Sequence, residues 1–286
     1  MDSAFVRERI GLGCSKLGSL SGIRGRDAEL LIETALESGV SFFDTASVYG
    51  QGDSERILGR VLRKRNVPAI VVTKAGQHFP WWASLLEPLK PALAGVVTGR
   101  RLGGMVARRR TPLLPRNFAA SFLKQSTNDS LRRLGMDHVD ILLLHSPTEA
   151  VIRGGEAMST LQSLQQSGKA RLIGVACDDA ETAITALRDP RVEAIEAPLW
   201  PWTSTSEKLL VLAGQKRVFV IARGLLSATL TQQQDGKPFR SPTADALSYC
   251  LTRPEINRLL VGTTKVHHLT QFLSLVSRLE KLTGSP

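Results

Sequence analysis

Residues 42–62, FFDTASVYGQGDSERILGRVL, place Asp44 and Tyr49 five residues apart, directly after a short apolar run. The chain contains only two tyrosines, so the presence of one in this turn suggests a specific role. One interpretation is a surface aromatic side chain that packs on its own loop. The other is a proton-transfer site that uses an aspartate and a tyrosine.

Two further ionisable residues end apolar runs: Lys74 closes AIVVTK and His145 closes VDILLLH. Each has an ordinary explanation alone, because such a lysine is usually solvated and such a histidine usually makes a structural hydrogen bond. If the runs are neighbouring parallel strands, however, their carboxyl ends meet at one rim. An ammonium group lowers the pKa of a nearby phenol, and a histidine orients an oxygen or assists proton transfer. The set predicts an acid that protonates the alkoxide formed when hydride reaches a carbonyl.

The elements that would position these residues alternate along the chain. The predicted strands are 9–14, 41–45, 69–74, 139–145, 171–177, 193–199, 217–223 and 258–263. The predicted helices are 27–39, 54–64, 118–135, 157–169, 179–189, 205–215, 243–253 and 267–282. Strands that are apolar on both faces indicate a parallel sheet covered by helices. Eight such units predict an α/β fold, a (β/α)8 TIM barrel that forms a single domain over residues 1–286. An open doubly wound sheet is the alternative, but GLGCSKLGS at 11–19 lacks its G-x-G-x-x-G signature.

One long insertion interrupts the alternation after the third strand, at 77–115. It contains adjacent tryptophans, Trp81 and Trp82, and 77–116 carries seven Lys and Arg residues against Glu87 alone. This segment therefore supplies more than half of the formal net charge of +11. Nucleic acid or an anionic membrane surface would suit such a segment. We favour a lid over the active-site rim, whose arginines attract an anionic substrate or the cofactor. No nucleic-acid partner is expected.

Composition excludes several other classes. The three cysteines are far apart with no Cys-x-x-Cys or Cys/His ligand spacing, so neither a disulfide framework nor a metal site is expected. No apolar run approaches the ~18 residues of a membrane span. The first residues, MDSAFVRERIGLG, have no apolar signal-peptide core. We therefore expect a cytoplasmic protein.

The motifs DTASVYG, VVTK and LLLHSP, taken in this order, resemble the aldo-keto reductase superfamily over essentially the whole chain. The resemblance implies a (β/α)8 barrel that uses NADPH without a Rossmann fold. It makes Tyr49 the general acid, Lys74 the neighbour that lowers its pKa, Asp44 the partner of Lys74 and His145 the orienting residue. A small-molecule carbonyl or alcohol would be the substrate, and a monomer is expected.

The resemblance also places a cofactor site in VGTTKVHHLTQF, at 261–272. It implies that the adenosine 2′-phosphate and adenine are surrounded by Gly262, Thr263, Thr264, Lys265 and His268. A phosphate suits a helix N-terminus with hydroxyl and basic donors, although an ordinary helix start with solvated charges would look the same. Arg223, at the end of the seventh predicted strand, either faces the cofactor phosphates or pairs with an acid, and we favour the phosphates.

The nicotinamide pocket departs from the family pattern. Family members commonly have Ser-Asn after the fifth strand, Gln on the sixth, a stacking aromatic nearby and an Asn near the adenine. The matching residues here are Ala176, Cys177, Glu196, Leu199 and Phe272, with Trp200 or Trp202 as substitutes for the aromatic. Two hypotheses follow: an NADPH-dependent reductase in which Cys177 and Glu196 still contact the cofactor, or an NADPH-binding or regulatory protein with little turnover.

Overall fold

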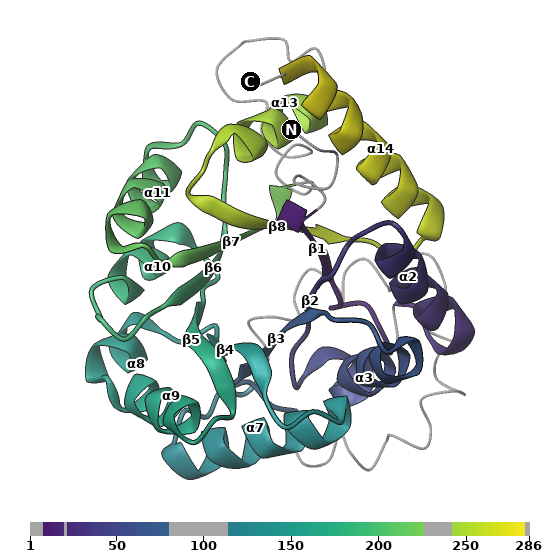
Figure 1. The fold of residues 1–286 in the computed structure, drawn as a ribbon. Coiled ribbons are helices and arrows are strands. Elements are labelled where there is room, and N and C mark those ends of the chain that lie inside the picture. The colour runs from purple at the N-terminus through teal and green to yellow at the C-terminus, as the bar shows by residue number, and fades with distance from the viewer. Residues whose placement is uncertain (1–7, 20–21, 80–113, 226–241, 284–286) are drawn as a thin grey trace.

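The computed structural model describes residues 8–19, 22–79, 114–225 and 242–283. Its centre is a closed barrel of eight parallel strands in chain order, surrounded by helices (Figure 1). The strands are β1 (Ile10–Gly13), β2 (Phe42–Asp44), β3 (Ile70–Ala75), β4 (Val139–His145), β5 (Ala170–Ala176), β6 (Ala194–Pro198), β7 (Phe219–Arg223) and β8 (Ile256–Gly262). β1 pairs with β8, Gly13 opposite Gly262, and this pairing closes the barrel. The predicted fold class is confirmed.

The helices form the outer layer. They are α2 (Gly25–Glu37), the 3-10 turn η1 (Tyr49–Gly52), α3 (Asp53–Arg65), α7 (Ala120–Leu134), α8 (Glu149–Gly154), α9 (Glu156–Gln166), α10 (Ala180–Ala186), α11 (Ser204–Lys216), α13 (Pro242–Thr252) and α14 (Val266–Thr283). The sequence did not predict η1 or α8, which are too short to show a helical period. Most of the predicted insertion at 77–115, with its tryptophans and arginines, lies outside the described residues.

Near the amino-terminal end of the barrel interior, an arginine lies beside two stacked aromatic rings. The Arg258 guanidinium carbon lies 5.4 Å from the ring centroid of Phe42 and 5.5 Å from that of Phe219. The two rings are stacked with their centroids 6.2 Å apart. These residues stand near the starts of their strands, so the polar residues at the strand ends occupy the opposite, carboxyl-terminal rim.

A buried glutamate fixes the segment that follows Tyr49. Glu55, fully buried in α3, accepts a hydrogen bond of 2.6 Å from Thr73 Oγ1 on β3 and another of 2.6 Å from Arg133 Nε on α7. Three elements are thereby joined through one carboxylate. The turn that carries Tyr49 is anchored at its far end by this contact.

Candidate active site

The four predicted proton-transfer residues meet at the carboxyl-terminal rim of the barrel. Asp44, Lys74 and His145 come from the ends of β2, β3 and β4 and are buried, whereas Tyr49 opens η1. Lys74 Nζ donates a hydrogen bond to Asp44 Oδ1 and lies 3.5 Å from the Tyr49 hydroxyl. The Tyr49 and His145 rings meet edge to face with centroids 5.8 Å apart. Residues spread over a hundred positions of sequence thus form one cluster.

The turn after Tyr49 requires an unusual backbone. Gly50 has φ 59° and Gln51 has φ 61°, both in the left-handed region. A Cβ atom on Gly50 would lie 2.7 Å from the carbonyl oxygen of Leu17. Only glycine fits this close approach without strain. The sequence YGQG therefore sets the direction from which Tyr49 enters the site.

Tyr49 is a phenol whose acidity is set by opposing effects. Burial raises its pKa to about 12, Lys74 lowers it, and the negative charges of Asp44 and Glu196 raise it. The lysine therefore acts in the expected direction, but desolvation and the two carboxylates outweigh it. Tyr49 is protonated at neutral pH, as a proton donor must be.

His145 is held neutral. Burial lowers its pKa well below the ordinary value, and the positive charges of Lys74, Arg223 and Arg116 lower it further. Its Nδ1 atom is buried and has no hydrogen-bond partner among the described residues. A neutral imidazole with an unpaired nitrogen beside a phenol suits an oxygen-bearing ligand.

The neutral state of His145 predicts a pH dependence of stability. In the unfolded chain this histidine has an ordinary pKa of about 6.5, so it binds a proton as the pH falls, whereas the folded protein does not. Stability is therefore lost below pH ~6.5, at up to about 1.4 kcal/mol per pH unit. We expect the difference in unfolding free energy between wild type and His145→Asn, measured in urea from pH 7.5 to 5, to shrink as the pH falls. Parallel curves would contradict a neutral buried His145.

A fifth ionisable residue joins the cluster from the other side of the barrel. Glu196, on β6, is 2% exposed and its Oε2 lies 3.1 Å from Lys74 Nζ. Burial and Glu196 raise the pKa of Asp44 to about 8, although Lys74 opposes them. Burial alone would lower the pKa of Lys74, but the two carboxylates outweigh it and keep the ammonium charged. The sequence placed Glu196 only in a cofactor pocket and missed this contact.

Arg223 points at acids and a carbonyl oxygen of the same rim. Its Nη2 donates a 2.6 Å hydrogen bond to the Cys177 carbonyl, and its Nε lies 3.3 Å from Glu196 Oε1. Asp178, which the sequence did not single out, lies 3.4 Å from Arg223 and from Arg116 and accepts a 2.8 Å bond from Ser146 Oγ. The alternative in which Arg223 pairs with an acid is therefore the one observed, and its contact with cofactor phosphates stays a prediction.

The predicted cofactor residues of 262–268 lie at the end of β8 and the start of α14. Thr263 Oγ1 accepts a 3.1 Å hydrogen bond from the Lys265 backbone N–H, as a helix-capping hydroxyl does. A Cβ atom on Gly262 would meet nothing within 4 Å, and Lys265 and His268 are exposed. An open glycine, hydroxyl groups, an ammonium group and a helix N-terminus fit a phosphate group.

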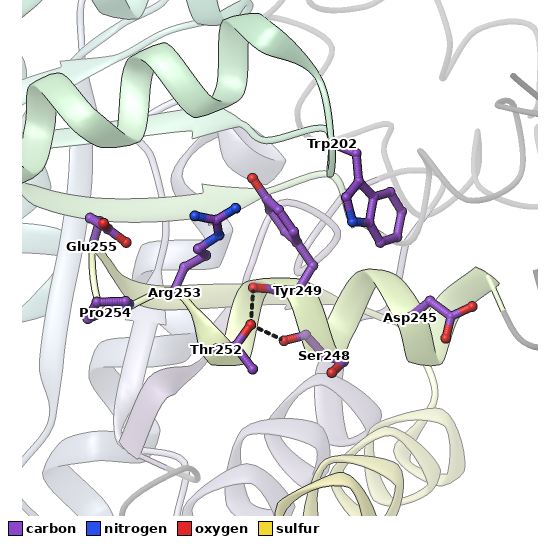
Figure 2. A pocket seen from close by; sticks show the side chains of 8 residues that line it. All are labelled: Trp202, Asp245, Ser248, Tyr249, Thr252, Arg253, Pro254 and Glu255. Carbon is purple, nitrogen blue, oxygen red and sulfur yellow. Dashed lines mark hydrogen bonds between the residues drawn. The ribbon is translucent and has the colours of Figure 1, made fainter. Parts of the chain in front are cut away.

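Two residues of the predicted nicotinamide and adenine pocket are enclosed instead, whereas Trp202 is 54% exposed. Leu199 and Phe272 are packed in the hydrophobic core, with 1% and 7% exposure. Trp202 lies against Tyr249, ring centroids 5.6 Å apart, in a hollow beside α13 (Figure 2). The stacking role of Trp200 or Trp202 stays a prediction.

That hollow is separate from the proton-transfer cluster. It has a volume of about 630 Å³, and its lining includes Trp202 but none of the four proton-transfer residues. The Arg253 guanidinium covers the Tyr249 ring at 4.8 Å, and the Tyr249 hydroxyl donates to Glu207 at 2.6 Å. Arg253 and Tyr249 lie side by side in this hollow (Figure 2).

Neither a metal-binding cluster nor a membrane-spanning helix is found among the described residues. No group of three or more His, Cys, Asp or Glu side chains there is arranged to hold a metal ion. None of the helices that the structure describes has the length and apolar character needed to cross a membrane.

The fold is a closed (β/α)8 barrel whose carboxyl-terminal rim holds a buried lysine beside a tyrosine. The sequence profile of the Aldo/keto reductase family matches residues 9–245, and the chain belongs to this family. Its relatives are reductases and dehydrogenases, so the chain is an oxidoreductase of the aldo-keto reductase type.

The relatives differ in substrate and cofactor. The chain is 27% identical to an L-galactose dehydrogenase of Arabidopsis thaliana, over 96% of this chain and 85% of that protein. It is 28% identical to an NADH-specific methylglyoxal reductase of Escherichia coli, over 78% and 67%. Among solved structures it resembles the holo form of an aldo-keto reductase from Bacillus halodurans (TM-score 0.71, 21% identity, 94% and 86% covered). An aldo-keto reductase from Klebsiella pneumoniae in complex with NADPH matches with a TM-score of 0.63 and 18% identity, over 97% and 92%.

Proposed function

We propose that this chain is an NADPH-dependent oxidoreductase that reduces an aldehyde or a ketone, or oxidises the corresponding alcohol or sugar, with Tyr49 as the general acid. The observation that carries the proposal is the Tyr49 hydroxyl 3.5 Å from a buried, charged Lys74. A phenol beside an ammonium group donates a proton and leaves a stabilised phenolate.

Each residue has one task in this reaction. Tyr49 donates its proton to the substrate oxygen, and Lys74 stabilises the phenolate that remains. Asp44 holds Lys74 in place, and neutral His145, whose Nδ1 has no partner among the described residues, orients the same oxygen. The nicotinamide cofactor supplies the hydride when it is bound. Its phosphate end would be held by the residues of 262–268, and the substrate oxygen would bind within reach of Tyr49.

Cofactor binding is the first test. We expect NADPH to bind more tightly than NADH in a fluorescence titration, because Lys265 and the helix N-terminus favour the additional phosphate. Lys265→Ala should weaken NADPH binding about tenfold, the effect of about 1.4 kcal/mol, and leave NADH binding unchanged. Lys208→Ala, an exposed lysine on α11, is the matched control. Equal affinities for the two dinucleotides, or an inert Lys265→Ala, would contradict the NADPH preference.

A second candidate is an NADPH-binding protein with little turnover. It is favoured by the contacts of Arg223 with Glu196 and the Cys177 carbonyl, two residues that the family resemblance assigns to the nicotinamide amide. Tight NADPH binding without hydride transfer to any of a broad carbonyl panel in a single turnover supports this candidate. Measurable single-turnover oxidation of NADPH supports the oxidoreductase.

A further inference from the structure

The ammonium group of Lys74 has more acceptors around it than it has protons. An ammonium group donates three hydrogen bonds. Those of Lys74 go to Asp44 Oδ1, to the Thr45 carbonyl at 3.2 Å and to the Tyr49 hydroxyl at 3.5 Å. Glu196 Oε2, at 3.1 Å, is closer than the hydroxyl but receives no hydrogen bond. The Tyr49 hydroxyl and Glu196 are thus alternative partners for the same proton.

A second cation, Arg223, affects how strongly Glu196 competes with the Tyr49 hydroxyl for the Lys74 ammonium. The other oxygen of Glu196, Oε1, lies 3.3 Å from Arg223 Nε. Because burial and Glu196 raise the pKa of Asp44 to about 8, both carboxylates are ionised above that pH, and Lys74 and Arg223 then balance their two negative charges. A buried charge without a partner is costly, so Glu196 at 2% exposure depends on both cations. Arg223, in contrast, is 32% exposed.

We propose that Glu196 is a further positioning residue of the proton-transfer site. Its carboxylate shares the Lys74 ammonium with Asp44 and is itself held by Arg223. Glu196 thereby sets how strongly the Lys74 ammonium interacts with the Tyr49 hydroxyl. The inference rests on the proposed role of Tyr49. Glu196 makes Tyr49 a weaker acid, whereas Arg223 moderates that effect by drawing on the same carboxylate.

The electrostatics agree with the geometry. Burial aside, the positive charges of Lys74 and Arg223 lower the pKa of Tyr49, whereas the negative charges of Asp44 and Glu196 raise it. The ionisable groups that face this cluster come from each neighbouring element. They are Cys14 after β1, Asp44, Tyr49, Lys74, Arg116, His145, Cys177 and Asp178 after β5, Glu196 and Arg223.

The experiment is a titration of the tyrosines in the protein without cofactor or substrate. With only two tyrosines in the chain, 13C label at the ring ζ carbon gives two NMR signals, and Tyr49→Phe assigns them. We expect Glu196→Gln to lower the Tyr49 titration midpoint by about one pH unit. Arg223→Met should raise it, because Glu196 then relies on Lys74 alone, and Arg223→Lys should restore it towards the wild-type value. The Tyr249 signal should stay in place throughout.

Glu193→Gln is the matched control. Glu193 immediately precedes β6 and accepts hydrogen bonds from Gln165 Nε2 and the Ile173 backbone N–H. A Glu196→Gln midpoint that moves no more than that of Glu193→Gln overturns the proposal. If Glu196→Gln does not fold, Arg223→Met decides, and a Tyr49 signal that it leaves unmoved overturns the proposal equally. Because the titration needs neither cofactor nor turnover, its outcome is independent of the NADPH-binding test.

Discussion

Replacing Tyr49 with phenylalanine is expected to lower kcat for carbonyl reduction by about 10²–10⁴-fold, the range that general acid catalysis contributes. The variant keeps the ring, and with it the edge-to-face contact with His145, but loses the hydroxyl near Lys74. No other hydroxyl group among the described residues forms a hydrogen bond with Lys74 Nζ. Steady-state kinetics with NADPH and a reducible aldehyde give kcat, and a fluorescence titration gives the NADPH Kd, which should change less than about twofold.

Tyr249→Phe is the control for this prediction. It removes the same hydroxyl group from the only other tyrosine, which lines a separate hollow (Figure 2) and donates its hydrogen bond to Glu207. We expect near wild-type turnover from this variant. Near wild-type turnover from Tyr49→Phe instead would remove Tyr49 as the general acid.

The fold was predictable because the strands carry a strong local signal. All eight predicted strands are present, with ends shifted by at most two residues. Runs such as VDILLLH are apolar on both faces because the barrel interior covers one side of β4 and helices cover the other. The turn η1 gave no such signal, since its shape depends on a close approach of Gly50 to the Leu17 carbonyl.

The sequence predicted only those contacts of the site that join residues on neighbouring strands. β2, β3 and β4 follow one another in the chain and in the barrel, so Asp44, Lys74 and His145 could be placed together. Glu196 lies three strands beyond β3, and its contact with Lys74 crosses the barrel mouth. Such a contact depends on the curvature of the closed sheet, which no local pattern encodes.

The acidity of Tyr49 shows a second limit. Sequence reasoning correctly gave the direction in which Lys74 acts, but burial raises the pKa of this phenol to about 12. Desolvation depends on all the atoms packed around the hydroxyl. Its size therefore becomes visible only once the surrounding strands and turns are in place.

Removing the Glu55 carboxylate gives the largest expected loss of stability. Glu55→Ala takes away the acceptor of both the Thr73 hydroxyl and the Arg133 guanidinium and leaves a gap between α3, β3 and α7. Breaking a buried ion pair on one side costs about 3–5 kcal/mol. Because the Arg133 side chain is 20% exposed and keeps a 3.1 Å bond to Ser130 Oγ, we expect the lower end, about 3 kcal/mol, in urea unfolding.

Glu149→Ala shows what an exposed ion pair contributes by comparison. Glu149 and Arg153 lie 2.8 Å apart on α8, with side chains 45% and 59% exposed. Such pairs contribute about 0.3–0.5 kcal/mol. The two glutamates have the same charge and partner type, so a large difference between the variants isolates the effect of burial. If Glu55→Ala lost no more stability than Glu149→Ala, the Glu55 carboxylate would not be what holds α3 and the Tyr49 turn against the barrel.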